Sequence, residues 1–169
     1  MLRHVALATI ALSAASAAAP PVQAREVVGM RDGRFDPGTI VIRTGERKLY
    51  FVTAPGEAIR YTVAVGKAGK QWRGVKYVEE LAVEPWWIAP PEIRRARGDS
   101  DRPVPPGPRN PMGARAIGLG PGGDYAIHGT NDPSSIGKFV SFGCIRMFNA
   151  DVIDLYARVR MGTPVIVTR

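Results

Sequence analysis

Residues 141–147 read Ser-Phe-Gly-Cys-Ile-Arg-Met (SFGCIRM) and contain Cys144, the only cysteine of the 169-residue chain. A single thiol cannot form a disulfide within the chain, so a disulfide-stabilised scaffold is excluded. Cysteine is often a small buried apolar residue, and this interpretation competes with that of a nucleophile. Gly143, directly before it, favours a loop over an apolar strand, and a loop is a suitable position for a reactive thiol.

The first 24 residues have the three parts of a secretory signal peptide. Arg3 gives a positive start, residues 5–12 form a short apolar run, and residues 22–24 (Val-Gln-Ala) fit a small-x-Ala cleavage site. The apolar run is shorter than the ~20 residues that span a bilayer, so we expect no stable membrane span. Export to an oxidising compartment disfavours an unpaired thiol without a use, which strengthens the case for a reactive Cys144.

After cleavage we expect residues 25–37 as an N-terminal lead-in and residues 38–169 as one domain, a length that suits a single hydrophobic core. The formal net charge is +8. Such a charge favours polyanionic surroundings, among which nucleic acid, a membrane surface and an anionic cell wall are candidates. Export argues against nucleic acid. A surface charge that only maintains solubility fits equally well.

Short strands separated by turns dominate the sequence. The alternation of apolar and polar residues predicts a mainly β domain, with strands at residues 39–42, 48–52, 59–65 and 164–167. The one clear helix follows Cys144: Asn149 is expected as its N-cap, and Gly162 is expected to end it. Residues 98–123 are rich in proline and glycine. They predict an ordered lid or site-lining loop, because loops of this length are usually functional or disordered.

The chemistry available to the mature chain is narrow, because His4 leaves with the signal peptide and His128 is the one histidine that remains. No ligand spacing for a zinc site is present, and no G-x-S-x-G serine motif is found. A thiol and imidazole pair is left, in which His128 would lower the pKa of Cys144 and act as its base. Gly143 would leave backbone N–H groups open to an oxyanion, and Arg146 adds a positive charge. From the residues alone, a structural role for both side chains stays open.

Two motifs resemble the signature of the L,D-transpeptidase catalytic domain family, the YkuD type. They are His128-Gly129-Thr130 and Ser141-Phe142-Gly143-Cys144-Ile145-Arg146-Met147. Segments upstream, among them Gln71-Trp72, are also similar to members of this family, and the likeness covers residues 38–169.

The resemblance implies a β-sandwich that carries a cysteine acyltransferase, with one main helix after the cysteine. It assigns these roles: Cys144 is the nucleophile, His128 the general base and acid, the Gly129 carbonyl orients His128, the N–H groups of Gly143 and Cys144 form the oxyanion hole, and Arg146, Ser141 and Thr130 support the site. It implies no metal and no cofactor.

The implied substrate is a peptidoglycan stem tetrapeptide, from which the terminal D-alanine leaves. The implied acceptor is an amine of another stem or of an envelope lipoprotein. The expected location is the periplasm or the cell wall, and a monomer is expected. Hydrolysis of the same bond, as in an L,D-carboxypeptidase, is an alternative, and so is a catalytically silent, basic wall-binding module.

Phe142 departs from the family pattern, because many members have a histidine at that position. The resemblance assigns the base to the upstream His128, which is present. We therefore expect Phe142 to tune the site rather than to abolish activity.

Overall fold

A computed structural model describes residues 25–30, 33–98, 100–121 and 125–169; the predicted signal peptide lies outside them. The strands are β1 (Glu26–Gly29), β2 (Ile40–Arg43), β3 (Lys48–Ala54), β4 (Glu57–Thr62), β5 (Val65–Gly66), β6 (Gly74–Val83), β7 (Arg115–Leu119), β8 (Tyr125–His128), β9 (Phe139–Ser141), β10 (Ile145–Arg146) and β11 (Pro164–Thr168). The helices are α1 (Pro91–Arg97) and α2 (Asn149–Tyr156), with a 3-10 turn at Pro133–Ser135.

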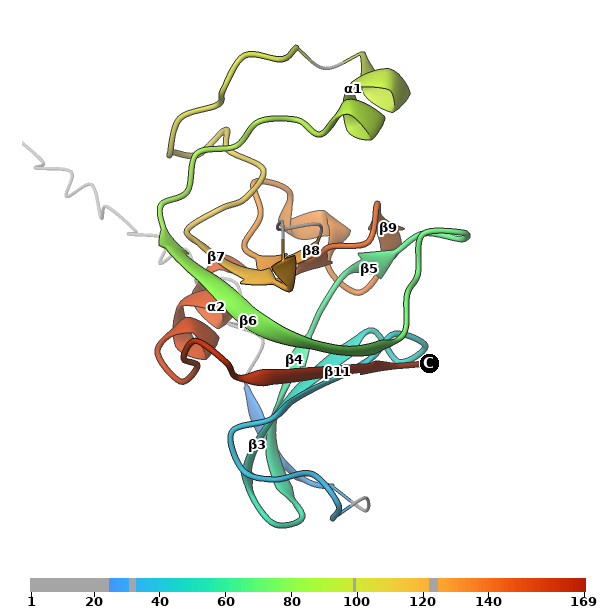
Figure 1. The fold of residues 1–169 in the computed structure, drawn as a ribbon, viewed down its shortest axis with the longest axis vertical. Coiled ribbons are helices and arrows are strands. Elements are labelled where there is room, and N and C mark those ends of the chain that lie inside the picture. The colour runs from blue at the N-terminus through green and yellow to red at the C-terminus, as the bar shows by residue number, and fades with distance from the viewer. Residues whose placement is uncertain (1–24, 31–32, 99, 122–124) are drawn as a thin grey trace, which may run out of the picture.

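Nine strands form one bent sheet in the order β1-β4-β3-β2-β11-β6-β7-β8-β10. The long strand β6 pairs with β11 and also with β7, so it belongs to both halves of the sheet (Figure 1). Ile40 and Leu49 from one half share a buried cluster with Ile117 and Ile127 from the other. The two halves therefore enclose one hydrophobic core, and the predicted mainly β sandwich is confirmed.

The predicted strands at residues 39–42, 48–52 and 164–167 are confirmed as β2, β3 and β11. In β2, Ile40 and Ile42 face the main core, while Val41 joins a second buried cluster on the opposite face. The prediction of one strand over residues 59–65 was wrong in part. The chain leaves β4 at Thr62, and β5 then pairs with β9 beside the SFGCIRM segment.

The predicted loop at residues 98–123 was too long, because its residues 115–119 form β7 in the interior of the sheet. Ile117 and Leu119 are fully buried there, and this apolar character outweighs the surrounding glycines. Strand β6 was not predicted, since most of its side chains are solvent-accessible and it contains Glu79 and Glu80. Such a strand lacks a clear apolar alternation.

Helix α1 was also not predicted. Pro91 occupies its first turn, where the missing proline N–H is not needed, and Gly98 ends it in the left-handed conformation. Helix α2 differs from its prediction at both ends. Asn149 is its first residue rather than its N-cap, because Phe148 holds that position, and the helix ends at Tyr156 rather than near Gly162.

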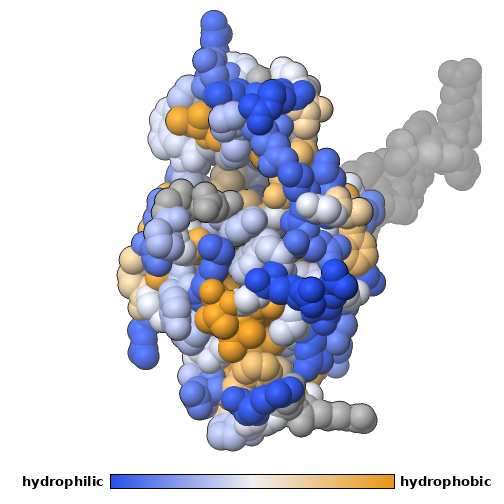
Figure 2. Space-filling model, turned by 45° about the vertical axis from the view of Figure 1, so that its right-hand side comes forward, coloured by the Kyte–Doolittle hydropathy of each residue, from blue (hydrophilic) through white to orange (hydrophobic). Residues whose placement is uncertain are grey.

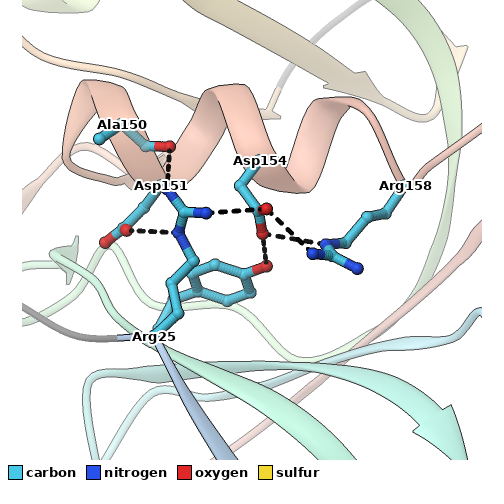
Figure 3. Close-up of polar contacts among 6 residues, drawn as sticks. Arg25, Ala150, Asp151, Asp154 and Arg158 are labelled. Atoms are coloured by element: carbon cyan, nitrogen blue, oxygen red, sulfur yellow. Dashed lines mark hydrogen bonds and ion pairs between the residues drawn. The ribbon is translucent and has the colours of Figure 1, made fainter.

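Asp154 of α2 is the centre of a group of charged and polar side chains, the Asp154 cluster (Figure 3). Its carboxylate accepts hydrogen bonds from the guanidinium of Arg158 at 2.9 and 3.0 Å and from the Tyr61 hydroxyl at 2.5 Å. The Arg25 guanidinium lies 2.9 Å from the same carboxylate. The cluster thus ties α2 to β4 and to the start of the predicted lead-in, from which β1 adds an edge strand to β4.

The visible surface in Figure 2 is mostly hydrophilic, with an apolar patch below the centre of this face. Among the large exposed apolar side chains are Trp86 and Ile88, from the segment between β6 and α1. Among the described residues, no helix is both long and apolar enough to cross a lipid bilayer.

Candidate active site

The parallel pairing of β8 and β10 brings the two candidate catalytic residues together. Ile145 pairs with Ile127, and Arg146 pairs with His128. Cys144 therefore lies just before β10, level with Ala126 on the neighbouring strand. The Met147 N–H donates to the His128 carbonyl at 2.8 Å and fixes this register directly beside the site.

Cys144 and His128 line the same cavity of about 260 Å³. The strand side of the cavity is formed by Ala126, His128, Ser141, Phe142, Cys144 and Arg146. The opposite side is formed by Trp86, Trp87, Ile88, Pro90, Ile93, Pro111 and Met112. These residues come from the segment that leads into α1, from α1 itself and from the loop before β7, which lie above β7 and β8 in Figure 1.

His128 is buried, and its Nδ1 lies 2.7 Å from the Gly129 carbonyl oxygen. A carbonyl oxygen can only accept a hydrogen bond, so Nδ1 carries the proton of the neutral ring and Nε2 keeps its lone pair. Burial, and to a smaller extent the Arg146 charge, lower the pKa of His128 to about 4, although the Gly129 and Pro111 carbonyls, which favour the protonated ring, act against both. The ring is therefore neutral at neutral pH.

Cys144 is partly exposed in a loop, and burial of its sulfur raises the pKa of the thiol. A hydrogen bond with the Ala126 backbone and the charge of Arg146 act in the opposite direction. The prediction that the site lowers this pKa was therefore wrong, because desolvation is the larger effect. The resting pair is a thiol and a neutral imidazole.

The side chain of Ser141 closes the loop that carries Cys144. Its hydroxyl donates to the Cys144 carbonyl at 2.6 Å and accepts from the Gly143 N–H at 3.1 Å. Gly143 was expected to offer this N–H to an oxyanion, but the structure uses it within the loop. Glycine is required here for two other reasons. Its φ is +128°, and an added Cβ would lie 2.4 Å from the Tyr125 ring.

Trp72 and Tyr125 form the support under this loop. Their rings are stacked with centroids 4.7 Å apart, and the Trp72 Nε1–H donates to the Gly143 carbonyl at 3.0 Å. Neither residue was predicted at the site from the sequence. The likeness of Gln71-Trp72 to the family was the one signal that pointed there, because Trp72 lies between strands in a segment without periodicity.

Asn149 holds the segment after His128 in place through the Asn149 cluster, which comprises Gly113, Ala114, Gly129, Thr130 and Asn149. The Asn149 Oδ1 accepts hydrogen bonds from the backbone N–H groups of Ala114 and Thr130, both at 3.1 Å, and the Asn149 Nδ2 donates to the Thr130 carbonyl at 3.0 Å. A Cβ on Gly129 would lie 2.1 Å from Oδ1, and one on Gly113 would lie 2.2 Å from it. Both glycines therefore permit the close approach.

Thr130 and Arg146 both lie near His128, Thr130 two residues after it and Arg146 opposite it on β10. The Thr130 hydroxyl accepts from the Asp132 N–H at 3.0 Å and starts the turn after the His-Gly-Thr motif. Arg146 lines the cavity, and its backbone exchanges two hydrogen bonds with Ala64, each 2.9 Å long. Thr130 therefore shapes the backbone, whereas Arg146 supplies charge at the site.

The part of the predicted lid loop before β7 is held in place by Asn110, which is fully buried. Its Nδ2 donates to the carbonyls of Pro85, Val104 and Pro105, and its Oδ1 accepts from the Met112 N–H at 2.8 Å. One amide side chain thus connects both segments that cover the cavity. The prediction of an ordered, site-lining loop is confirmed for this part.

Phe142 lines the cavity next to Cys144, and the Lys67 ammonium lies 3.9 Å from the centre of its ring. Such a cation–π contact fixes the ring orientation and brings a positive charge to the edge of the site.

Among the described residues, no group of three or more His, Cys, Asp or Glu side chains is arranged to hold a metal ion.

The fold and the site define a mainly β domain with a cysteine and a histidine in one covered cavity. The sequence model of the L,D-transpeptidase catalytic domain family, YkuD, matches residues 37–167. The chain belongs to this family.

Two relatives and one solved structure illustrate the similarity. The Escherichia coli (strain K12) protein named "Probable L,D-transpeptidase ErfK/SrfK" is 39% identical over 135 residues, which are 75% of this chain and 42% of that protein. YkuD of Bacillus licheniformis is 36% identical over 143 residues, 83% of this chain and 81% of that protein. L,D-transpeptidase 3 from Mycobacterium tuberculosis, solved with a faropenem-derived adduct, has a TM-score of 0.61 at 16% identity and covers 78% of this chain and 60% of its own.

Proposed function

We propose that this chain is an exported peptidoglycan L,D-transpeptidase in which Cys144 is the nucleophile and His128 the general base. One observation carries the proposal: Cys144, just before β10, and His128, at the end of the parallel neighbour β8, line one cavity. Membership of the L,D-transpeptidase family supports the reaction class.

In the first half-reaction His128 Nε2 takes the thiol proton while the sulfur attacks the carbonyl carbon before the terminal D-alanine of a stem tetrapeptide. The pKa values support this order, since a neutral imidazole and a neutral thiol need the proton transfer before or during attack. The C–N bond then breaks, and the imidazolium returns its proton to the amine of the departing D-alanine. A thioester on Cys144 is left.

In the second half-reaction an amine of another stem, or of a lysine in an envelope lipoprotein, attacks the thioester carbonyl. His128 takes the proton that the amine loses, the C–S bond breaks, and the thiol is regenerated with that proton. A new amide bond results, and no oxidant or cofactor takes part. Hydrolysis by the L,D-carboxypeptidase route differs only in that water replaces the amine.

The supporting residues act on the two reacting groups. The Gly129 carbonyl keeps the proton on Nδ1 and so leaves Nε2 as the base. Arg146 lowers the pKa of both His128 and Cys144, which favours a neutral base and an ionised nucleophile. Because Ser141 already uses the Gly143 N–H, the Cys144 N–H is the donor that we assign to the oxyanion. In addition, Ser141 keeps the loop around the nucleophile closed.

The cavity walls and the surface charge fit a peptide from an anionic wall. Trp86, Trp87 and Met112 offer an apolar cover for the stem. The formal net charge, +8 for the whole chain and +7 once Arg3 is removed, favours the anionic wall around it.

The first test is mass spectrometry of the purified protein, residues 25–169, after incubation with faropenem. We expect one covalent adduct on Cys144 and none on the Cys144→Ala variant. Disaccharide-tetrapeptide is then supplied as substrate, and the products are separated. Cross-linked dimers indicate transfer and free tripeptide indicates hydrolysis. A folded protein that forms neither an adduct nor either product would be a wall-binding module, and the proposal would be wrong.

A further inference from the structure

We propose that Trp72 is a positioning residue for the oxyanion hole: its indole N–H fixes the Gly143–Cys144 peptide so that the Cys144 N–H is directed into the cavity. The inference rests on the proposed acyl transfer and adds a residue that the family motifs do not contain. Trp72 is 72 positions before the nucleophile and outside both motifs, yet it contacts the backbone of the SFGCIRM loop directly.

The argument begins with the geometry of one peptide unit. The Gly143 carbonyl and the Cys144 N–H belong to the same peptide group, which is planar and trans, so the two bonds point in opposite directions. Trp72 Nε1 holds the carbonyl oxygen at 3.0 Å. The described residues that line the cavity do not include Trp72. The hydrogen bond therefore keeps the carbonyl turned away from the cavity and the Cys144 N–H turned toward it.

The Gly143–Cys144 peptide lies between two peptide groups that Ser141 already holds, and Ser141 does not hold this one. Ser141 holds the Gly143 N–H and the Cys144 carbonyl, which belong to the peptide groups before and after it. Gly143 itself has the conformational freedom of glycine, with φ at +128°, so its peptide can rotate readily without an external partner. The Trp72 N–H supplies that partner.

The indole is itself rigidly held. Trp72 stacks on Tyr125 with an interplanar angle of 25°, and the Tyr125 ring packs against Gly143 so closely that a Cβ on Gly143 would lie 2.4 Å from it. The Lys76 ammonium lies 5.9 Å from the Trp72 ring centre and 5.3 Å from that of Tyr125. A donor held in this way needs little reorganisation during the reaction, which is what makes an oxyanion hole effective.

The test compares two reactions of the same sulfur in the Trp72→Phe variant, which keeps an aromatic ring for Tyr125 but has no N–H. Faropenem acylation develops a negative charge on a carbonyl oxygen. Iodoacetamide alkylation displaces iodide at a saturated carbon and develops no charge on a carbonyl oxygen. Removal of a direct oxyanion donor lowers rates by about 10²–10³-fold, and misalignment of a donor that stays present should lower acylation by about 10-fold. We expect the alkylation rate and its pH profile to stay within about twofold of the wild type.

Tyr125→Leu provides the second test, since it removes the stacking partner and leaves the Trp72 N–H in place. Its acylation rate should fall by less than that of Trp72→Phe, again with unchanged alkylation. Tyr125→Phe keeps the ring and serves as the matched control, with both rates unchanged. Thermal unfolding of each variant shows whether it is folded.

Three outcomes separate this inference from the function on which it rests. Acylation and alkylation that fall in parallel in both variants would mean that Trp72 is merely structural, and the inference would be overturned. It would also be overturned by a folded Trp72→Phe variant with wild-type acylation. A wild-type protein that iodoacetamide alkylates but faropenem does not acylate contradicts the proposed function itself.

Discussion

Helix α2 takes part in two polar clusters that differ in chemistry. The Asn149 cluster, at its first residue, consists of backbone groups, two glycines and one neutral amide side chain. The Asp154 cluster, further along the helix, consists of Arg25, Arg158, Asp151, Asp154 and the Tyr61 hydroxyl (Figure 3). One helix is thus fixed by neutral hydrogen bonds near the candidate site and by ion pairs away from it.

The difference follows from what each place tolerates. A charge close to a buried titratable group acts strongly on it, because the protein interior screens charge poorly. The Asn149 cluster adjoins His128, whose pKa is already lowered by burial and by Arg146. A neutral amide fixes the backbone there without a further electrostatic effect on the imidazole. In the Asp154 cluster the carboxylate is largely buried but is paired with Arg25 and Arg158, whose side chains are 36% and 38% exposed, so its charge is balanced by partly hydrated partners.

The largest effect on acylation is expected from substitution of His128, which adjoins the Asn149 cluster. His128→Gln keeps an amide that can donate to the Gly129 carbonyl but removes the base. Since general base catalysis contributes about 10²–10⁴-fold, we expect acylation by faropenem at pH 7 to slow by that factor. Alkylation of Cys144 by iodoacetamide at high pH should persist, because the thiolate then forms without a base. Wild-type acylation in the variant would contradict the assignment of His128.

The second prediction concerns stability in acid. The pKa of His128 is about 4 in the folded protein and 6.5 in the absence of its environment, so the unfolded chain binds more protons between these values. The stabilisation from the neutral, buried ring is complete above pH 6.5 and is lost as the pH falls toward 4, on the order of 3 kcal/mol.

Urea unfolding between pH 7 and 4 measures this loss, with His128→Gln as the control. The variant lacks the titrating group and should show a flatter profile, while effects of the carboxyl groups are common to both proteins. Parallel profiles would mean that His128 is not buried in the neutral form.

Asn149 provides the direct test of the neutral cluster. Asn149→Ala leaves the N–H groups of Ala114 and Thr130 without their acceptor and should destabilise the protein by about 2 kcal/mol. Asn149→Asp keeps the acceptor and places a negative charge at a helix N-terminus, so it should be less destabilising. That charge should raise the pKa of His128, and the acid limb of faropenem acylation, near pH 4 in the wild type, should shift upward. An unshifted limb would show that neutrality at this position is irrelevant to His128.

The sequence predicted the parts of the fold and site that depend on local patterns. Strands β2, β3 and β11 follow from apolar runs bounded by turns. Cys144 and His128 were paired as candidates because the predicted mature chain contains one cysteine and one histidine. The contacts that were missed connect distant segments. Nothing near Trp72 indicates that its N–H reaches Gly143. Asn149 fits the pattern of an N-cap, which predicts a local bond rather than its contacts with Ala114 and Thr130.

The remaining differences have the same cause. Whether the Gly143 N–H is open depends on the rotamer of Ser141, and whether burial outweighs a neighbouring positive charge at Cys144 depends on how deeply the loop packs. Neither quantity is encoded in the spacing of residues. The motif therefore predicts which residues are present at the site, while their protonation and hydrogen bonding require the folded structure.

The smallest effect is expected in the charged cluster, from Asp154→Asn. The Arg158 guanidinium, with further contributions from Tyr61 and Arg25, holds the pKa of Asp154 below its usual range. The carboxylate therefore stabilises the fold above its unfolded pKa of 3.8, and this contribution is lost as the pH falls through the lower, folded value. Because the partners are partly exposed, we expect the variant to be destabilised by only about 1 kcal/mol at pH 7, less at high salt and not at all in strong acid.

Acylation by faropenem should be unchanged in Asp154→Asn, since the cluster touches neither Cys144 nor His128. Salt titration of the unfolding free energy, with the wild type in parallel, measures the first part, and the acylation rate measures the second. A loss of acylation as large as that in Asn149→Ala would mean that α2 transmits strain from its charged face to its first turn. The two clusters would then be one mechanical unit, and neutrality near the imidazole would no longer explain why they differ.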